Sequence, residues 1–253
     1  MELARHGHRT GRLLVAAAIG FLVFDSCGLP TPSYLAPPIS GGPIQSGQGT
    51  FAFTNDAVNN NTGNFYGYEL YYKFYSVSGT TSLASDTAAI ETSTTPGTAL
   101  LTSEGYIPVL PNIAPGTVRT LPLIPFDATQ RAQPITVTLD FQGSTGSVLP
   151  AKATLSDGTP FIELKRNGPM IVLSSGTGTP VLKGFLAGNF GSGTPNYEST
   201  DSDLTGVSLT GSVTLAVVVL AYGVDLSTLS AIYSTPYFLG TVNLNYGQWP
   251  TQS

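Results

Sequence analysis

Histidine and cysteine are almost missing from this 253-residue chain, and charged side chains are scarce. The histidines are His6 and His8, the single cysteine is Cys27, and Asp, Glu, Lys and Arg together make up 10% of the residues, against about 25% in ordinary soluble domains. Ser-His-Asp hydrolysis, Cys-His chemistry and most zinc sites need an imidazole or a thiolate. Downstream of Cys27 the sequence offers neither group, so it excludes these classes of enzyme there.

The first residues have the pattern of a secretory signal peptide. Three arginines precede an uncharged apolar run over 13–24, which is shorter than the roughly 20 residues of a membrane-spanning helix. Phe24-Asp25-Ser26-Cys27 follows, and it resembles the lipobox of bacterial lipoproteins. The resemblance implies that residues 1–26 are removed and that lipid, palmitate included, on Cys27 anchors the protein in a membrane of the cell envelope. The alternative is a buried free cysteine in an uncleaved helix.

Residues 27–48 are rich in proline and glycine, which oppose helix and favour an extended tether. Cys-Gly-Leu-Pro-Thr-x-x-Tyr-Leu-x-Pro-Pro, which starts at Cys27, resembles the mature N-terminus of uncharacterised spirochaete envelope lipoproteins. That resemblance implies a location but no activity. We therefore expect the folded part to be a single β-rich domain over 49–253.

Charge limits the partners of the mature protein. Of ten bases, three leave with the signal peptide, and of fifteen acids two leave, so the net charge becomes −6. The remaining bases are scattered, which argues against nucleic-acid binding and against electrostatic attraction to anionic lipid. The expected partners are the membrane, through the lipid, and an unknown envelope protein or glycan.

Composition and periodicity predict a mostly β fold. The chain has 29 Gly and 19 Pro, and short β-branched or aromatic segments alternate with turn residues. A strand is expected at Phe51 and Phe53, and the polar run over 55–64, with Asn59 to Asn61 at its tip, reads as a loop. Further strands are expected at 119–124, 135–141, 152–155, 161–165, 170–173, 181–186, 206–210, 212–222, 230–233 and 237–245.

Two of the expected strands have distinctive patterns. In the aromatic segment 65–75, Tyr68, Leu70, Tyr72 and Phe74 alternate with more polar residues, which predicts a half-buried strand whose rings pack in the core. A ligand platform is the alternative use of such a ladder. The continuous apolar run over 215–221 predicts a central strand that is covered on both faces.

Residues 84–104 interrupt the strand pattern and predict a small helical insertion. Asp86 is a candidate helix cap, Pro96 suits the first turn of a second helix, and Gly105 is suited to end it. The rest of the pattern suggests an elaborated β-sandwich. Gly67-Tyr-Glu-Leu-Tyr-Tyr-Lys resembles the C strand of fibronectin type III modules, and 213–222 with 230–239 resembles their last two strands, which implies an immunoglobulin-like sandwich with a large insertion.

Carboxylates are the remaining conventional acid–base groups besides tyrosine and lysine. Asp201 and Asp203 are spaced as oxygen ligands of calcium can be, but the EF-hand order is missing, and a solvated loop is the simpler reading. Asp157-Gly158-Thr159 reads as a turn. A glycosidase needs two carboxylates, and Glu69, Glu163 and Asp140 lie on expected strands, although nothing selects a pair.

The glycine-rich runs over 176–178 and 188–193 lack the Lys-Ser/Thr of a phosphate-binding loop and read as loops. We therefore assign no catalytic, cofactor-binding or metal-binding residue, and Cys27 is the only site residue. The expected function is a lipid-anchored binding or structural module of the envelope that is not an enzyme. A carboxylate-based hydrolase of envelope glycans and an outer-membrane β-barrel are the alternatives.

Overall fold

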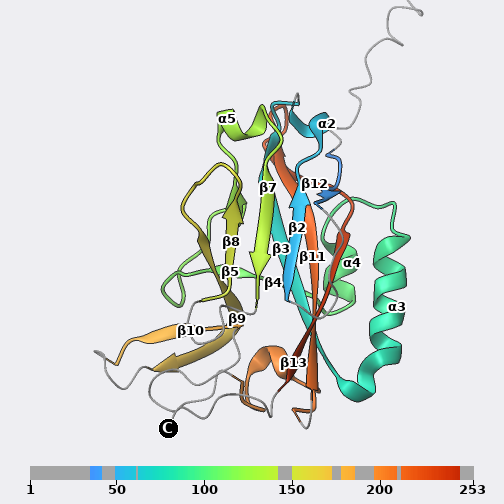
Figure 1. Ribbon diagram of the computed structural model, residues 1–253, viewed down its shortest axis with the longest axis vertical. Helices are drawn as coiled ribbons and strands as arrows, with labels where there is room; N and C mark the ends of the chain where they lie inside the picture. Colours follow the sequence, from blue (N-terminus) through green and yellow to red (C-terminus); the bar gives the residue numbers. More distant parts are fainter. Residues whose placement is uncertain are drawn as a thin grey trace, which may run out of the picture. The chain divides into compact units, whose positions relative to one another are not determined.

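The computed structural model describes residues 35–41, 49–60, 62–141, 150–172, 178–185, 197–209 and 212–245. Two antiparallel sheets lie face to face, and helices cover the outer face of one of them (Figure 1). Strands take up 43% and helices 17% of the described residues, which confirms the mostly β, sandwich-like fold. The predicted signal peptide, Cys27 and the glycine-rich runs over 176–177 and 188–193 lie outside the described residues.

The first sheet is built from strands that alternate apolar and polar side chains. Phe51 and Phe53 point into the core beside Val137 and Leu139, which sit opposite them in the register. In order, the strands are β1 (Ile39–Ser40), β2 (Thr50–Thr54), β7 (Thr136–Asp140), β8 (Lys152–Leu155), β9 (Ile162–Val172) and β10 (Pro180–Gly184), with β5 (Leu110–Pro111) also beside β9.

The second sheet is centred on its two longest strands, β3 (Phe65–Ser76) and β11 (Ser212–Asp225), which pair over almost their whole length. Both are covered on both faces, as the continuous apolar run in β11 predicted. The order is β12 (Ser230–Tyr233), β11, β3 and β4 (Ile107–Pro108); β13 (Tyr237–Asn245) also pairs with β11, and β6 (Ile124–Pro125) with β3.

The aromatic ladder of β3 belongs to the core between the sheets. Tyr68 and Tyr72 are fully buried, and their rings meet Phe53 and Phe185 edge-on at centroid distances of 4.9 and 4.8 Å. The packing reading is therefore right and the ligand-platform reading wrong. The prediction that β3 is only half-buried is also wrong, because its other face is covered as well, down to a fully buried Glu69.

That other face lies under a short 3₁₀ turn, η1 (Val77–Gly79), and two helices, α3 (Thr80–Glu91) and α4 (Ala99–Ser103). Ile90 and Leu101 pack against Val218 and Leu220 of β11 in a second core. This confirms the helical insertion, although α3 begins before residue 84. Figure 1 shows both helices at the side of the second sheet.

Individual positions in the insertion differ from their predicted roles. Asp86 does not cap a helix; it lies within α3 and faces the sheet, where Lys73 Nζ and the Tyr75 hydroxyl each lie 2.6 Å from its Oδ2. Pro96 precedes α4, which begins at Ala99. Gly105 ends α4 as predicted, at φ +79°, a conformation that glycine adopts without a Cβ penalty.

The start of the described chain is part of the domain. Leu35 is fully buried, and the side chain of Asn59 in α2 (Ala57–Asn60) bonds both the amide and the carbonyl of Ala36 at 2.8 Å. β1 then pairs with β2. The predicted free tether over 27–48 and the boundary at residue 49 are therefore wrong for residues 35–41. The prediction that Asn59 lies at a loop tip is also wrong, because its buried side chain connects α2 to Ala36.

Four predicted strands take another form. Residues 119–123 are irregular, because Arg119 reaches the Val109 carbonyl and the Glu69 carboxylate, and only β6 follows. The segments at 161–165 and 170–173 form one strand, β9, and residues 206–209 form no strand.

The turn predicted at 157–159 is confirmed. Asp157 Oδ1 accepts from the Thr159 amide at 3.0 Å, and Gly158 has a φ of +84°. The other carboxylate oxygen of Asp157 accepts from Gln130 of α5 (Ala128–Arg131).

The Asp86 contacts make stability depend on pH. Burial alone would raise the pKa of Asp86, but hydrogen bonds from Lys73 and Tyr75 outweigh burial and hold it below its ordinary value of 3.8. A carboxyl whose folded pKa is lowered stabilises the fold above its unfolded pKa and loses that stabilisation as pH falls through the folded value. We expect Asp86→Asn to be less stable than the wild type at pH 7, by an amount that shrinks between about pH 4 and pH 2. Urea unfolding across this range measures it, and a constant difference would contradict the assignment.

Candidate functional site

Asp201 and Asp203 belong to a buried ionic network. Arg166 on β9 is completely buried; its Nη1 lies 2.9 Å from Asp201 Oδ2 and its Nε 2.8 Å from Asp203 Oδ2, while Nη2 contacts Asp203 Oδ1. Lys183 on β10 lies 2.7 Å from Asp201 and 2.6 Å from Glu198. We call these five residues the Arg166 network. The prediction of a solvated loop at Asp201 and Asp203 is wrong, because two cations from neighbouring strands hold these carboxylates.

The Arg166 network joins parts of the chain that are far apart in the sequence. The Tyr72 hydroxyl, on β3 of the other sheet, donates to Asp203 at 2.7 Å, and Asp203 lies in the 3₁₀ turn η2 (Ser202–Leu204). The guanidinium of Arg166 lies over the rings of Phe74 and Tyr197, at 5.3 and 4.5 Å from their centroids. Both oxygens of Asp203 thus accept from arginine, which indicates a structural role in place of calcium binding or acid–base chemistry.

The three carboxylates considered for a glycosidase are separately engaged. Glu69 is buried on β3; its Oε1 accepts from the Leu123 amide at 2.7 Å and its Oε2 lies 2.5 Å from Arg119. Burial raises the pKa of Glu69, and Arg119 offsets part of the rise. Glu163 on β9 lies 2.6 Å from Lys165, and Asp140 on β7 stands opposite Lys152 in the register. The three lie on different strands, and none lines either of the cavities described below.

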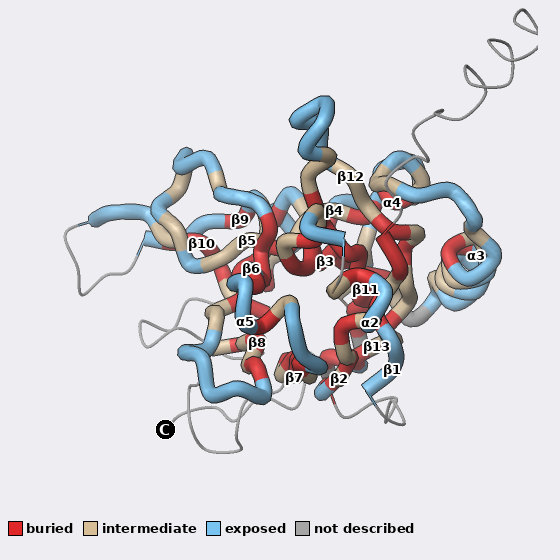
Figure 2. The backbone as a smooth tube through the Cα atoms, turned by 90° about the horizontal axis from the view of Figure 1, so that it is seen from above, coloured by how far each residue is buried: buried red, intermediate tan, exposed pale blue. Residues whose placement is uncertain are grey.

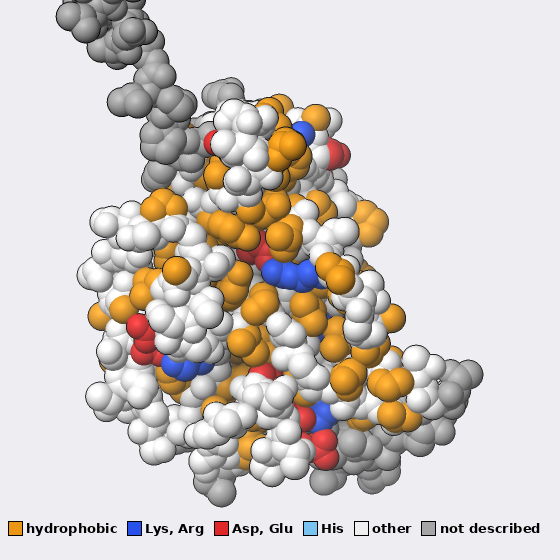
Figure 3. All heavy atoms as spheres, turned by 180° about the vertical axis from the view of Figure 1, so that it is seen from behind, with side chains coloured by type: hydrophobic (Ala, Val, Ile, Leu, Met, Phe, Trp, Pro, Cys, Tyr) orange, Lys and Arg blue, Asp and Glu red, His pale blue; other side chains and the backbone are white. Residues whose placement is uncertain are grey.

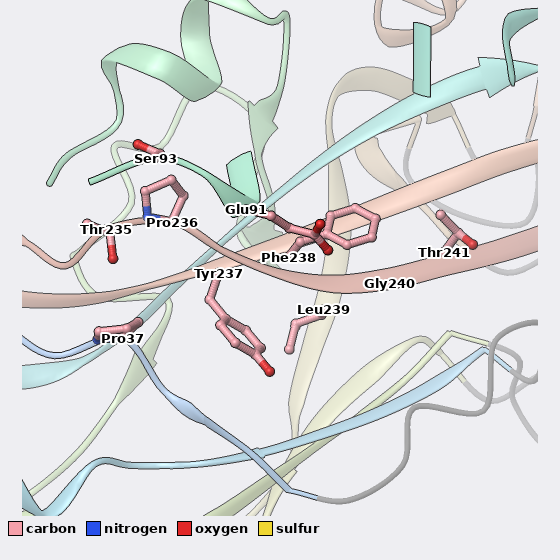
Figure 4. A pocket seen from close by; sticks show the side chains of 10 residues that line it. All are labelled: Pro37, Glu91, Ser93, Thr235, Pro236, Tyr237, Phe238, Leu239, Gly240 and Thr241. Atoms are coloured by element: carbon pink, nitrogen blue, oxygen red, sulfur yellow. The ribbon is translucent and has the colours of Figure 1, made fainter. Parts of the chain in front are cut away.

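A groove runs along β13 at the edge of the second sheet (Figure 4). Its volume is about 600 Å³, within the range of ligand pockets. One edge of β13 pairs with β11, and the described residues place no strand on its other edge. The β13 groove is lined by Pro37, by Glu91 and Ser93 at and just beyond the end of α3, by Thr235 and Pro236, and by β13 from Tyr237 to Thr241.

The two sides of the β13 groove differ in character. Tyr237 and Leu239 lie on the same side of β13 as Pro37, while Phe238 lies beside Glu91 on the helix side (Figure 4). The register between β11 and β13 shifts after Val217, so that Leu239 has no partner in the pairing and its side chain is buried. The bulge leaves half-buried aromatic rings on both sides of the strand edge.

Binding is the chemistry that the β13 groove offers. Hydroxyls of Ser93, Thr235 and Thr241 line the groove together with the rings of Tyr237 and Phe238, and Glu91 is its one charged group. Aromatic faces with neighbouring hydroxyls suit a polar ligand that has apolar faces, such as a sugar ring, and an open strand edge suits an extended peptide. The sequence marked residues 237–245 only as a strand, because alternation does not show which strand stands at an edge.

A second cavity, of about 580 Å³, lies beside the Arg166 network. Tyr72, Lys73, Asn167, Ser202 and Asp203 are among its lining residues. Of its three charged lining residues, Lys73 is engaged by Asp86 and Asp203 by Arg166, which leaves the carboxylate of Glu104. On the face seen in Figure 3, acidic and basic side chains likewise lie close together among hydrophobic and neutral side chains. The β13 groove is therefore the better candidate for a ligand site.

Within the described ranges, no group of three or more His, Cys, Asp or Glu side chains is placed to hold a metal ion. The helices in that part of the chain include none that is long and apolar enough to cross a membrane. Comparisons of the chain with protein-family models, with curated proteins and with solved structures found no match. The candidate site therefore rests on the geometry of the β13 groove.

Proposed function

We propose that this protein is a lipid-anchored binding module of the bacterial cell envelope and not an enzyme, and that it binds its ligand in the β13 groove. The anchor is the lipid proposed on Cys27, which follows an apolar run of signal-peptide length. The ligand is an envelope glycan or an extended segment of an envelope protein. Both would use the rings and hydroxyls of the groove, and a peptide would also use the open edge of β13.

The observation that carries this proposal is the composition of the β13 groove. It combines aromatic rings, hydroxyls and one carboxylate, so it has contacts for binding but no second acid among its lining residues. A glycosidase needs two carboxylates on either side of the scissile bond. The acids that the sequence offered for this role lie on separate strands beside basic residues, which favours binding over hydrolysis.

One prediction from this proposal concerns the anchor. When cells are labelled with a palmitate analogue, we expect the wild type to carry the label and Cys27→Ser to carry none, because Cys27 is the chain's single thiol and the acceptor of the lipid. Gel fluorescence of the purified chains measures the difference. Equal labelling of the two chains would end the lipoprotein proposal.

A further prediction concerns the groove. Tyr237→Ala in the full chain removes a half-buried ring, and we expect it to weaken binding at least tenfold, the effect of losing an aromatic anchor. The probes are peptidoglycan fragments, envelope polysaccharides and a solubilised envelope fraction. Phe161→Ala is the matched control, because Phe161 is a 54% exposed ring outside the groove and its loss is expected to leave affinity unchanged.

The same panel tests the rival function. Turnover of a glycan that a single Asp or Glu substitution abolishes, with the far-UV spectrum unchanged, would replace the binding module with a hydrolase. Equal loss of binding in Tyr237→Ala and Phe161→Ala would remove the β13 groove as the site but leave the module proposal in place.

A further inference from the structure

Three large apolar side chains stand exposed at one end of the sandwich. They are Val58 of α2, 57% exposed, and Leu226 and Leu229 of the turn between β11 and β12, 59% and 80% exposed. We call this the α2 end. The Asn64 carbonyl, which follows α2 in the chain, accepts from the Val224 amide at 2.9 Å and so joins the two loops. Figure 2 looks down on this end and shows the exposed surface of α2 and of the turn before β12.

The β11–β12 turn holds its leucines outward in a defined conformation. Asp225 accepts from the amide and the hydroxyl of Ser227 at 2.8 and 2.6 Å, and the Leu229 amide donates to the Asp225 carbonyl at 2.7 Å. Leu229 has a φ of +56°, where glycine or asparagine is usual. An exposed leucine in a strained backbone conformation contributes nothing to packing within the domain. Its side chain is therefore expected to contact something outside the domain.

The N-terminal segment joins the domain at this same end. Leu35 is buried there, and a Cβ on Gly223, near the end of β11, would lie 3.1 Å from its Cδ1. The next residue, Ala36, is fixed to α2 through Asn59. An anchor on the chain before Leu35 therefore restrains the position of the α2 end.

Chain length limits how far the α2 end can be from the anchor. Eight residue steps separate Cys27 from Leu35. At ~3.3–3.6 Å per step, they span at most about 29 Å, less than the thickness of a bilayer with its headgroups. This step rests on the lipid proposed on Cys27. With that lipid in the membrane, Leu35 stays within about 29 Å of the anchored Cys27 however the intervening residues are arranged, which keeps the α2 end near the bilayer.

We infer that the α2 end lies on the bilayer, with Val58, Leu226 and Leu229 in contact with the boundary between headgroups and acyl chains. Separate apolar side chains on loop tips suit a fluid lipid surface, into which each can insert by itself. The carboxylates beside them, Asp56 and Asp225, accept hydrogen bonds from amides of their own loops. With acids and no basic cluster there among the described residues, the contact is apolar and does not depend on anionic lipid.

Tryptophan fluorescence in vesicles tests this orientation. In the lipidated full chain, with its single native tryptophan removed by Trp249→Phe, one tryptophan is placed by Val58→Trp, Leu229→Trp or Val172→Trp. Val172, 52% exposed on the end of β9, is the matched control, because it has the size and exposure of Val58 but lies at the opposite end (Figure 1). The vesicles are phosphatidylcholine with brominated acyl chains, and circular dichroism checks each fold.

We expect bromine to quench the tryptophans at positions 58 and 229 at least three times as strongly as the one at 172. Equal quenching at all three positions, or none at 58 and 229 while the chain still floats with the vesicles, would overturn the orientation and leave the anchor standing. A chain that does not float with the vesicles would overturn the anchor, and the inference with it.

Discussion

Arg166→Met is expected to lower the free energy of unfolding by about 3–5 kcal/mol, the cost of removing one partner from a buried ion pair. Arg166 is completely buried and is held by Asp201 and Asp203. Methionine fills much of the same space, so the main loss is the compensation of these carboxylates. Lys183 still reaches Asp201, whereas among the described residues Asp203 keeps the hydroxyl of Tyr72 alone as a hydrogen-bond donor from a side chain. Urea unfolding followed by circular dichroism measures the change.

Arg131→Met is the matched control for this substitution. Arg131 lies at the end of α5, where its side chain bonds the Phe65 carbonyl and lies over the ring of Tyr66, in contrast to the paired carboxylates around Arg166. We expect a loss of about 1 kcal/mol or less, as for most surface changes. In the double variant Arg166→Met, Asp203→Leu the cost should fall below that of the single variant, because no carboxylate is left alone at that position. A loss under about 1 kcal/mol in Arg166→Met itself would show that the Arg166 network does not hold the sheets together.

A chain that begins at residue 49 is expected to be roughly 3–5 kcal/mol less stable than one that begins at residue 34. The shorter chain loses the burial of Leu35, about 1.5–3 kcal/mol, and leaves the buried amide of Asn59 without its two partners at Ala36, about 1–3 kcal/mol more. Both chains should give β-dominated far-UV spectra. The difference should therefore appear in the midpoint of urea unfolding and not in the content of secondary structure.

Point substitutions in the longer chain locate this loss. Leu35→Ala should cost about 2–5 kcal/mol, as for other large-to-small changes in a core. Ile39→Ala should cost less than about 0.5 kcal/mol, because Ile39 is 51% exposed on β1. If the chains that begin at residues 34 and 49 were equally stable, residues 35–41 would belong to the tether, as the sequence predicted.

The elements that could be predicted from the sequence are those with local signals. Alternation in β3, the unbroken apolar run of β11 and the glycine that ends α4 each depend on neighbouring residues, and each predicted its element, although β3 is covered on both faces and α4 begins after Pro96. What failed depends on distant partners. Asn59 was predicted at a loop tip because its partner, Ala36, is 23 residues earlier in the chain. Asp203 was predicted in a solvated loop because its partner, Arg166, is 37 residues earlier.

The candidate site was missed for the same reason. Tyr237 and Phe238 are ordinary strand residues by their pattern, and only the pairing of β13 with β11 on one side makes its other edge a groove wall. The likeness to fibronectin type III modules stays a prediction. The three segments that carry it do pair with one another, as β3 with β11 and β11 with both β12 and β13.

The pairing of β3 with β11 also sets the order in which the chain can fold. Its register joins Ser76 to Val213 and Phe65 to Gly223, so β3 cannot be completed until most of the chain has been made. Contacts so distant in sequence form slowly, and an unpaired aromatic or apolar strand is prone to aggregate in the meantime. Whether the first two thirds of the polypeptide reach the native state is thus decided by the arrival of the last third.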